Sequence, residues 1–253
     1  MRLIPQLAAL TLAGTTACGA FAQATVTPDG QWRSALSLGA SLSSGNTKSN
    51  NIAFTGDAVK ATAQDKLRLY GAALRASSGG TTTSDQFRLG GRYDYNLSAA
   101  YFGYGGVDFE RDKGANLNSR IALGAGLGWH VIKDANTTFD VFGGVAQTAD
   151  RFVAATVIDG SSRTRYSYTS LVLGEESSHK LNPTMTFTQR MTLLPNLKNT
   201  GEFRAIFDAG LAMAVSKGMN VNIGFSHRYN SEPGAGIKKG DTLLTTGVSV
   251  KFD

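Results

Sequence analysis

The sequence predicts an all-β protein, a closed antiparallel transmembrane β-barrel of about 12 strands. Three observations lead to this fold class. Apolar and polar residues alternate with a period of two along most of the chain. The alternating segments are roughly 10 to 12 residues long, the length that a tilted strand needs to cross a bilayer. Long and short connections also follow one another in turn, as they do in outer-membrane barrels.

The alternation is clearest in six segments, of which 86–97 is typical. There Phe87 and Leu89 lie on one face, while Arg88 and Arg92 lie on the other. The other clear segments are 32–43, 120–131, 202–213, 221–226 and 245–252. Less regular strands are expected at 51–62, 66–77, 101–111, 137–149, 165–176 and 184–194. An even number of strands lets a closed antiparallel sheet place both chain ends on one side.

The connections support this arrangement. Long connections are expected at 44–50, 78–84, 112–118, 150–164, 195–201 and 231–241. Short turns are expected at 63–65, 98–100, 133–136 and 216–219, and a longer connection at 177–183 is the exception. Long loops on one side and short turns on the other are typical of barrels in the outer membrane.

The polar face of the strands carries bulky charges, which we expect to line the lumen. These residues are Arg88, Arg92, Asp94, Glu110, Arg120, Asp140, Arg190, Arg204 and Asp208. Glu110, Asp94 and Asp208 are expected to pair with arginines among Arg88, Arg92, Arg120 and Arg204. A lumen whose charges are paired conducts little, whereas separated charges would line an ion passage. The alternative is a soluble periplasmic barrel, which binds an apolar ligand and turns its apolar face inward.

Aromatic residues are expected near the ends of the strands, where they would form girdles at the membrane surfaces. The candidates are Trp32, Tyr95, Tyr101, Phe102, Trp129, Tyr229 and Phe252.

Residues 1–22 are typical of an export signal. Arg2 is followed by the apolar stretch 3–14, and small residues at Ala20 and Ala22 favour cleavage before Gln23. The barrel domain is then expected to cover 23–253. Cleavage would remove Cys18, the single cysteine, and with it any disulfide or thiol chemistry. A lipoprotein signal at Cys18 is the alternative interpretation.

The C-terminal strand carries a second indication of destination. Thr245, Gly247, Val250 and Phe252 form a polar-x-Gly-x-x-apolar-x-aromatic pattern. This pattern resembles the signal that directs bacterial outer-membrane barrels to the barrel-assembly machinery. The expected location is therefore the cell outer membrane.

The formal net charge of +6 does not indicate nucleic-acid binding, because the basic residues are scattered and no recognition motif is present. The expected partners are outer-membrane lipid and lipopolysaccharide, the barrel-assembly machinery, and a small solute or ion. No cofactor, metal site or catalytic residue is expected. Gly124, Gly126 and Gly128 lack the spacing of a dinucleotide site, and we expect them to leave room for lumen arginines.

The three histidines are the natural catalytic candidates. His130 is expected to be a hydrogen-bonded lumen residue, and His179 is expected to lie in a solvated turn that includes Glu175 and Glu176. His227 and Asn230 resemble part of the active-site strand of outer-membrane lipid A deacylases. In that strand a nucleophilic serine stands two residues after the histidine.

Here Tyr229 occupies the serine position, which removes the nucleophile. Ser226 or Ser231 would have to replace it, and Ser226 points to the other face. A lipid hydrolase centred on His227 therefore remains an alternative function rather than the expected one.

Several segments together resemble the family of salt-induced outer-membrane proteins. They are Leu42 to Thr47, Leu89 to Asp94, Phe109 to Asp112, Gly174 to Leu181, Tyr229 to Ser231 and Lys238 to Thr242. The resemblance covers roughly 31–252. It implies one outer-membrane barrel whose expression is linked to salt or osmotic stress, and it supplies no catalytic residues. The expected function is that of a non-enzymatic envelope component or a narrow pore for small solutes.

Overall fold

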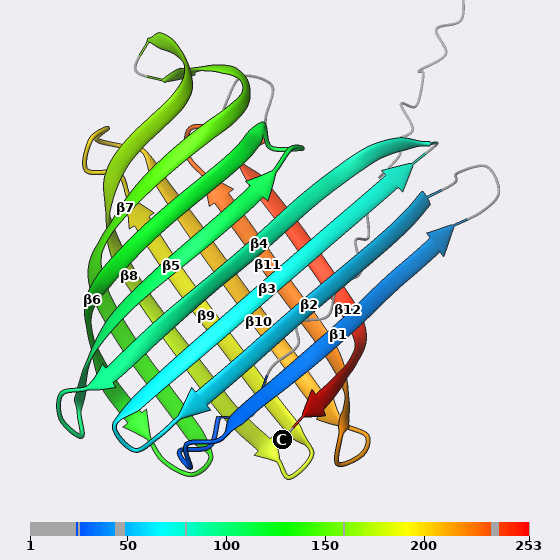
Figure 1. The fold of residues 1–253 in the computed structure, drawn as a ribbon, viewed down its shortest axis with the longest axis vertical. Coiled ribbons are helices and arrows are strands. Elements are labelled where there is room, and N and C mark those ends of the chain that lie inside the picture. The colour runs from blue at the N-terminus through cyan, green and yellow to red at the C-terminus, as the bar shows by residue number, and fades with distance from the viewer. Residues whose placement is uncertain are drawn as a thin grey trace, which may run out of the picture.

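In a computed structural model, the chain forms a closed barrel of twelve antiparallel strands (Figure 1). The structure describes residues 24, 26–43, 49–78, 80–158, 160–233 and 238–252. The strands are β1 (Trp32–Ser43), β2 (Ser49–Ala61), β3 (Asp65–Ser78), β4 (Thr81–Asn96), β5 (Tyr101–Asp112), β6 (Leu117–Lys133), β7 (Thr137–Ile158), β8 (Ser161–Asn182), β9 (Met185–Pro195), β10 (Phe203–Ala214), β11 (Met219–Asn230) and β12 (Gly240–Phe252). Each strand pairs with the next in sequence, and β1 pairs with β12. The predicted fold class and strand number are confirmed.

The two ends of the barrel differ in their connections. At the end where β1 begins and β12 finishes, here called the terminus end, the turns are 62–64, 97–100, 134–136, 183–184 and 215–218. At the opposite loop end, the connections include 196–202 and 231–239. Three predicted connections are wrong, because strands occupy most of 78–84, 150–164 and 177–183. The third correction removes the exception, so every connection at the terminus end is short.

The β7–β8 hairpin rises above the rest of the loop end (Figure 1). The pairing of β6 with β7 ends at Leu117↔Phe152, whereas β7 and β8 remain paired to Ile158↔Ser161. Gly160 then turns the chain with a φ of 69°, a left-handed conformation that glycine adopts without steric cost. The predicted loop at 150–164 is therefore the outer part of a long hairpin.

One contact identifies the inner face of the sheet. Arg68 on β3 forms an ion pair with Glu176 on β8, and these strands are not neighbours. Only side chains inside the barrel can meet in this way. Two carboxylates of the inner face are buried, Asp57 (5 % exposed) and Asp150 (4 %), whereas Leu38 and Leu127 on the outer face are each 63 % exposed.

This distribution is the inverse of that in a water-soluble barrel, and it suits a lipid exterior. Large apolar side chains cover the outside: Leu36, Leu38, Ile52, Phe54, Leu69, Leu89, Val107, Ile121, Leu123, Leu127, Val145, Leu173, Ile223, Leu244 and Val248 are all exposed. Closure pairs the backbone of one strand with the next, as the membrane interior requires. Within the described residues, no helix has the length and apolarity to span a bilayer.

Aromatic side chains mark the terminus end of the outer surface. Trp32, Tyr95, Tyr101, Trp129 and Phe252 are exposed there. At the loop end, Tyr229 packs against Phe203 with ring centroids 5.5 Å apart. The prediction that Phe102 belongs to the aromatic girdle is wrong, because its ring points into the barrel and is 2 % exposed. Its neighbour Tyr101 points outward, and successive residues of a strand point to opposite faces.

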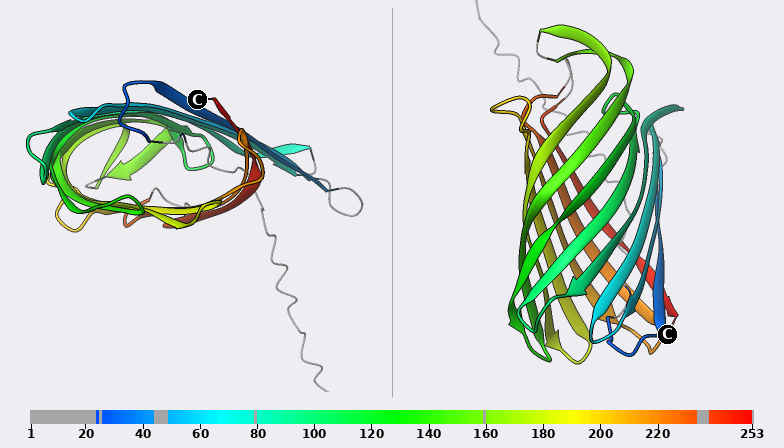
Figure 2. Two further views of the ribbon diagram at one scale, coloured as in Figure 1. Left: turned by 90° about the horizontal axis from the view of Figure 1, so that it is seen from below. Right: turned by 60° about the vertical axis from the view of Figure 1, so that its left-hand side comes forward.

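The barrel is oval in cross-section when viewed along its axis (Figure 2). The described register joins β1 to β12 through five residue pairs, from Ser34↔Phe252 to Leu38↔Val248. In contrast, β1 and β2 share twelve pairs. The boundary between β1 and β12 is therefore a short seam.

Candidate functional site in the barrel lumen

The terminus half of the lumen holds a group of ionised side chains, here called the Glu176 cluster. Its members are Asp57, Lys66, Arg68, Arg92, Asp94, Glu176 and Arg190. Arg68 Nε donates to Asp57 Oδ1 at 2.8 Å, and its Nη1 lies 3.9 Å from Glu176 Oε1. Glu176 also pairs with Arg190 at 3.5 Å. Since β3 and β8 lie on opposite walls, the Arg68–Glu176 pair crosses the lumen.

On the β4 wall of the same cluster, Asp94 accepts from two cations. Arg92 Nε lies 2.6 Å from Asp94 Oδ1, and Lys66 Nζ lies 3.1 Å from Asp94 Oδ2. Lys66 and Arg92 also act electrostatically on Glu176. Cations from β3, β4 and β9 thus converge on one carboxylate of β8.

The loop half of the lumen holds the Glu110 cluster, formed by Arg88, Glu110, Arg120, Asp150, Arg204, Asp208 and Arg228. Arg120 makes a bidentate pair with Asp150, with Nε–Oδ1 at 2.7 Å and Nη2–Oδ2 at 2.6 Å. Arg88 and Arg120 approach Glu110 to 3.1 and 3.5 Å. Two parallel hydrogen bonds make the Arg120–Asp150 pair the strongest kind of ion pair.

The far wall completes this cluster. Arg204 on β10 and Arg228 on β11 act electrostatically on Glu110 of β5, six strands away from β11. Arg228 pairs with Asp208 at 3.2 Å, and Ser226 Oγ donates to the same carboxylate at 2.6 Å. Each cluster holds four cations and three carboxylates, so most charges are paired and each cluster keeps an excess of one positive charge.

An aromatic shelf lies on the inner wall beside the Glu176 cluster. Tyr104 and Phe142 pack edge to face with centroids 5.5 Å apart. The Arg92 guanidinium carbon lies 4.3 Å from the Tyr104 centroid and 4.6 Å from the Phe142 centroid. Arg190 lies 5.4 Å from the Phe142 centroid. These cation–π contacts hold both arginines toward the middle of the lumen.

Glycines make room for the aromatic shelf, and not for arginines as the sequence suggested. A Cβ at Gly128 would lie 2.1 Å from Cζ of Phe102. A Cβ at Gly126 would lie 2.8 Å from Cε1 of Tyr104 and 2.1 Å from the backbone oxygen of Gly143. The inward rings of β5 therefore lie flat across the neighbouring strand β6.

A glycine also makes room for the ring of Tyr70. A Cβ at Gly90 would lie 2.4 Å from Cζ of Tyr70, so the ring crosses β4 at the glycine. The Tyr70 hydroxyl then donates to the Asp108 carboxylate on β5. This bond joins β3 to β5 between the two ionic clusters.

The structure brings eight of the nine charged residues chosen from the sequence into the two clusters. The ninth, Asp140, lies 2.7 Å from Nδ1 of His130. The expected partner of Asp208 is wrong, because Asp208 pairs with Arg228. Arg204 has no ion-pair partner within 4 Å in the described part of the chain, and it lies 6.0 Å from the Tyr168 ring.

Sequence reasoning missed six cluster members: Asp57, Lys66, Arg68, Asp150, Glu176 and Arg228. Arg68 stands between Leu67 and Leu69, so the alternation itself could have identified it. Asp150 and Glu176 were hidden by the wrong ends predicted for β7 and β8.

None of the three histidines belongs to a serine–histidine arrangement. His130 is held by Asp140 and by Asn96 Oδ1 at 3.1 Å. His179 lies within β8 and not in a turn, and its ring stacks on Phe187.

His227 is on the outer face, where its Nδ1 lies 2.8 Å from Oγ1 of Thr242. Ser226 is bonded to Asp208 in the lumen, and Ser231 Oγ accepts from the backbone amide of Phe203 at 2.8 Å. Neither candidate nucleophile contacts His227. Within the described residues, no group of three His, Cys, Asp or Glu side chains could hold a metal ion.

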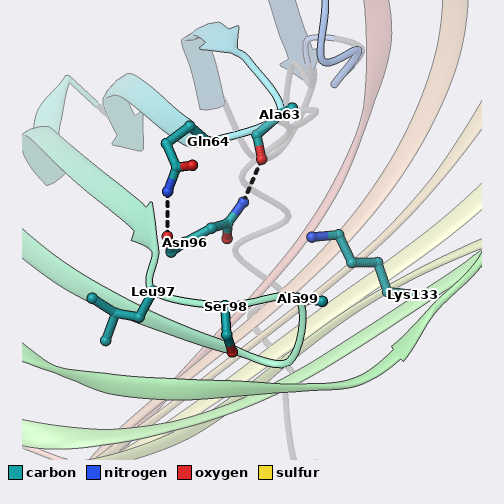
Figure 3. A pocket seen from close by; sticks show the side chains of 7 residues that line it. All are labelled: Ala63, Gln64, Asn96, Leu97, Ser98, Ala99 and Lys133. Atoms are coloured by element: carbon teal, nitrogen blue, oxygen red, sulfur yellow. Dashed lines mark hydrogen bonds between the residues drawn. The ribbon is translucent and has the colours of Figure 1, made fainter.

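The terminus mouth of the lumen contains two further features. A shallow pocket of about 480 Å³ lies between two turns and is lined by Gln64, Asn96 and Lys133, among others (Figure 3). Nearby, the backbone amide of Ala24 donates to Asp57 Oδ2 at 3.0 Å. The segment before β1 is thereby tied to the Glu176 cluster. Asp29 accepts from Arg33, which holds the pKa of Asp29 well below its usual range.

Comparisons with known proteins identify one family and several solved structures that resemble the chain. The family model described as "Protein of unknown function, DUF481" matches residues 36–252. The translocator domain of the autotransporter NalP from Neisseria meningitidis is similar in structure at 15 % identity, with 90 % of this chain and 89 % of that chain covered and a TM-score of 0.48. The NanC porin is also similar in structure, at 10 % identity, with 87 % of this chain and 97 % of that chain covered and a TM-score of 0.45. No match was found among curated proteins.

Proposed function

The chain belongs to the family described as "Protein of unknown function, DUF481", and from its barrel we propose a non-enzymatic outer-membrane protein. Its lumen would be a narrow passage for small polar solutes or ions. We infer that charged side chains which reach across the lumen close this passage. The observation that carries this proposal is the Arg68–Glu176 pair between opposite walls.

The placement in the outer membrane is supported by the exterior of the barrel. Apolar side chains face outward, and the short turns lie on the side of both termini, as in barrels of that membrane. Export by residues 1–22 lies outside the described residues and stays a prediction. So do contact with the assembly machinery and the link to salt stress.

The polarity of the lumen supports passage of hydrophilic molecules and not of lipids. Two clusters of paired charges line it, and mobile ions would have to compete with those pairs. Because the pairs are compensated, the closed state is expected to conduct little. Removal of the pair that crosses the lumen should open the way.

Planar-bilayer recording tests this proposal with the double variant Arg68→Ala/Glu176→Ala. We expect rare, small openings in the unaltered protein and a conductance roughly threefold or more higher in the variant, because two long side chains leave the constriction. The matched control is Asp85→Ala/Arg111→Ala, which removes an ion pair from the outer face. Its conductance should equal that of the unaltered barrel. If every folded variant is silent, the lumen is not a passage.

The terminal strand provides a separate prediction about assembly. Phe252→Ala should lower the fraction of heat-modifiable, folded barrel in outer-membrane fractions, because the proposed signal ends in this aromatic. Phe252 lies outward on β12, opposite Ser34 of β1. Phe225→Ala, which removes an outward aromatic from β11, is the control. Equal assembly of the two variants would contradict a role for Phe252 as a signal.

A further inference from the structure

A row of cations follows the outer face of β3 to β8 at the loop end, here called the basic row. Its members are Arg75, Arg111, Lys113, Arg151, Arg165 and Lys198. The arginines of the row face away from the lumen, and in the described residues none of the six side chains forms an ion pair with either ionic cluster. In the described part of the chain, Asp85 is the carboxylate that pairs with members of the row.

The first half of the basic row surrounds Asp85 on β4. Arg75 is its register partner on β3. Arg111 Nη2 lies 3.0 Å from Asp85 Oδ1, and Lys113 Nζ lies 3.7 Å from Asp85 Oδ2. Among the described residues, Arg111 Nε finds no hydrogen-bond partner. Two cations thus share one carboxylate and a third stands opposite it on β3, so three positive charges gather around one negative charge.

The second half lies on the β7–β8 hairpin. Arg151 and Arg165 are direct cross-strand partners, and both are exposed. Like charges at directly opposed positions repel each other and destabilise a strand pair. Neither has an ion-pair partner in the described part of the chain. An anion bound between them would remove the repulsion.

Lys198 extends this half of the row. Its Nζ donates to the backbone oxygen of Ser167 at 3.1 Å and lies 5.0 Å from the Tyr166 centroid. It borders an outer pocket of about 300 Å³ whose lining includes Gln147 and Thr169. The pocket adds hydroxyl and amide groups next to the cations.

The level of the row matches that of lipid headgroups. Immediately below Arg111, Phe87 and Phe109 pack with centroids 6.0 Å apart, and they belong to the apolar exterior. Ser119, the register partner of Arg151, lies two residues from the start of β6, so Arg151 is also at the rim. The row therefore lies where an apolar surface ends and water begins.

The described part of the opposite wall differs. On β10 and β11 the outward residues at this level are Phe203, Ala205 and Tyr229, none of which is a cation. Lys238 and Lys239 lie between β11 and β12 and are followed by the acidic Asp241. A general attraction to anionic membranes would not require the cations to gather on one side of the barrel.

We propose that the basic row binds the phosphates of lipid A in the outer leaflet, with the acyl chains against the apolar belt below. This inference rests on the proposed outer-membrane placement. The excess of positive charge, the opposed arginines and the position above the apolar belt all complement a phosphorylated glycolipid.

Native mass spectrometry of the full barrel in non-ionic detergent tests the site with diphosphoryl lipid A as the probe. The variant is Arg111→Gln/Arg151→Gln/Arg165→Gln. The control is Lys60→Gln/Lys133→Gln/Lys217→Gln, which removes three exposed cations at the terminus end. Heat-modifiable migration verifies that each barrel is folded. We expect lipid A binding to weaken about tenfold or more in the variant and to be unchanged in the control.

Other arms identify the chemistry. Dephosphorylated lipid A should bind the unaltered barrel as weakly as lipid A binds the variant, and added salt should weaken the binding of diphosphoryl lipid A. Equal binding by variant and control overturns the site, as does equally tight binding of phosphatidylglycerol or inorganic phosphate. These results leave the conductance test untouched. Failure of the barrel to fractionate with the outer membrane would instead remove the placement on which both proposals depend.

Discussion

Replacement of Asp150 by alanine is expected to destabilise the barrel by about 3 kcal/mol. The change leaves Arg120 buried without its bidentate partner, and only Glu110 remains at 3.5 Å. Three more arginines act on the same carboxylate of Glu110. Glu110 therefore cannot compensate Arg120 alone. The measurement is urea unfolding, followed by the loss of heat-modifiable migration.

Two controls separate an unpaired charge from a lost attraction. The double variant Arg120→Met/Asp150→Leu removes both ions, and its stability should lie close to that of the unaltered protein, because apolar replacements of a buried pair are often neutral. Asp208→Ala removes a more exposed carboxylate from the same cluster, and its effect should be about 1 kcal/mol or less. An Asp150→Ala barrel as stable as the original would contradict the burial argument.

Gly126→Ala is expected to impair folding, with a loss of about 1 to 3 kcal/mol. The new Cβ would lie 2.1 Å from the backbone oxygen of Gly143 and 2.7 Å from Cα of Gly144. Backbone atoms of a neighbouring strand cannot turn aside as a flexible side chain can, so β6 and β7 would have to separate. Urea unfolding and the yield of folded barrel measure the effect.

The matched control is Gly124→Ala, two residues earlier on the same face of β6. Its Cβ would meet nothing closer than 3.6 Å, which is ordinary contact. The two variants lose the same backbone freedom, so the difference between them reports the close approach alone. Equal stabilities would show that β6 and β7 are not held as near as described.

Much of this fold follows from local pattern. Apolar and polar residues alternate wherever a strand has lipid on one side and lumen on the other, which is why β6 could be predicted to within three residues of each end. For β4 the predicted C-terminal end is correct to one residue, but the strand begins five residues earlier than predicted. Above the membrane no lipid contacts the outer face, so a strand no longer needs apolar residues on that face. The outer parts of β7 and β8 lose the alternation for that reason, and 150–164 therefore resembled a loop.

The turn predicted at Glu175 to His179 is wrong for a different reason. Five polar residues in a row are typical of a turn, yet here they continue β8. Glu176 faces the lumen, where Arg68 and Arg190 pair with it. Glu175 faces outward near Gln189, whose amide lies 3.4 Å from its carboxylate. A strand can carry such residues because each face provides partners that the local sequence does not contain.

The contacts across the lumen could not be predicted from the sequence. Arg68 and Glu176 are more than a hundred positions apart, and their meeting depends on the oval section of the barrel and the register of several strands. Phe102 is the opposite case. It follows Tyr101 directly, so the two rings had to point to different faces.

Because the β1–β12 pairing is short, the barrel is expected to open first between these two strands. Five residue pairs join β1 to β12 in the described register, whereas twelve join β1 to β2. Rupture there would convert the tube into one curved ribbon without disturbing any hairpin. We expect the first and last strands to join last during folding, because that step hides the remaining backbone edges from lipid.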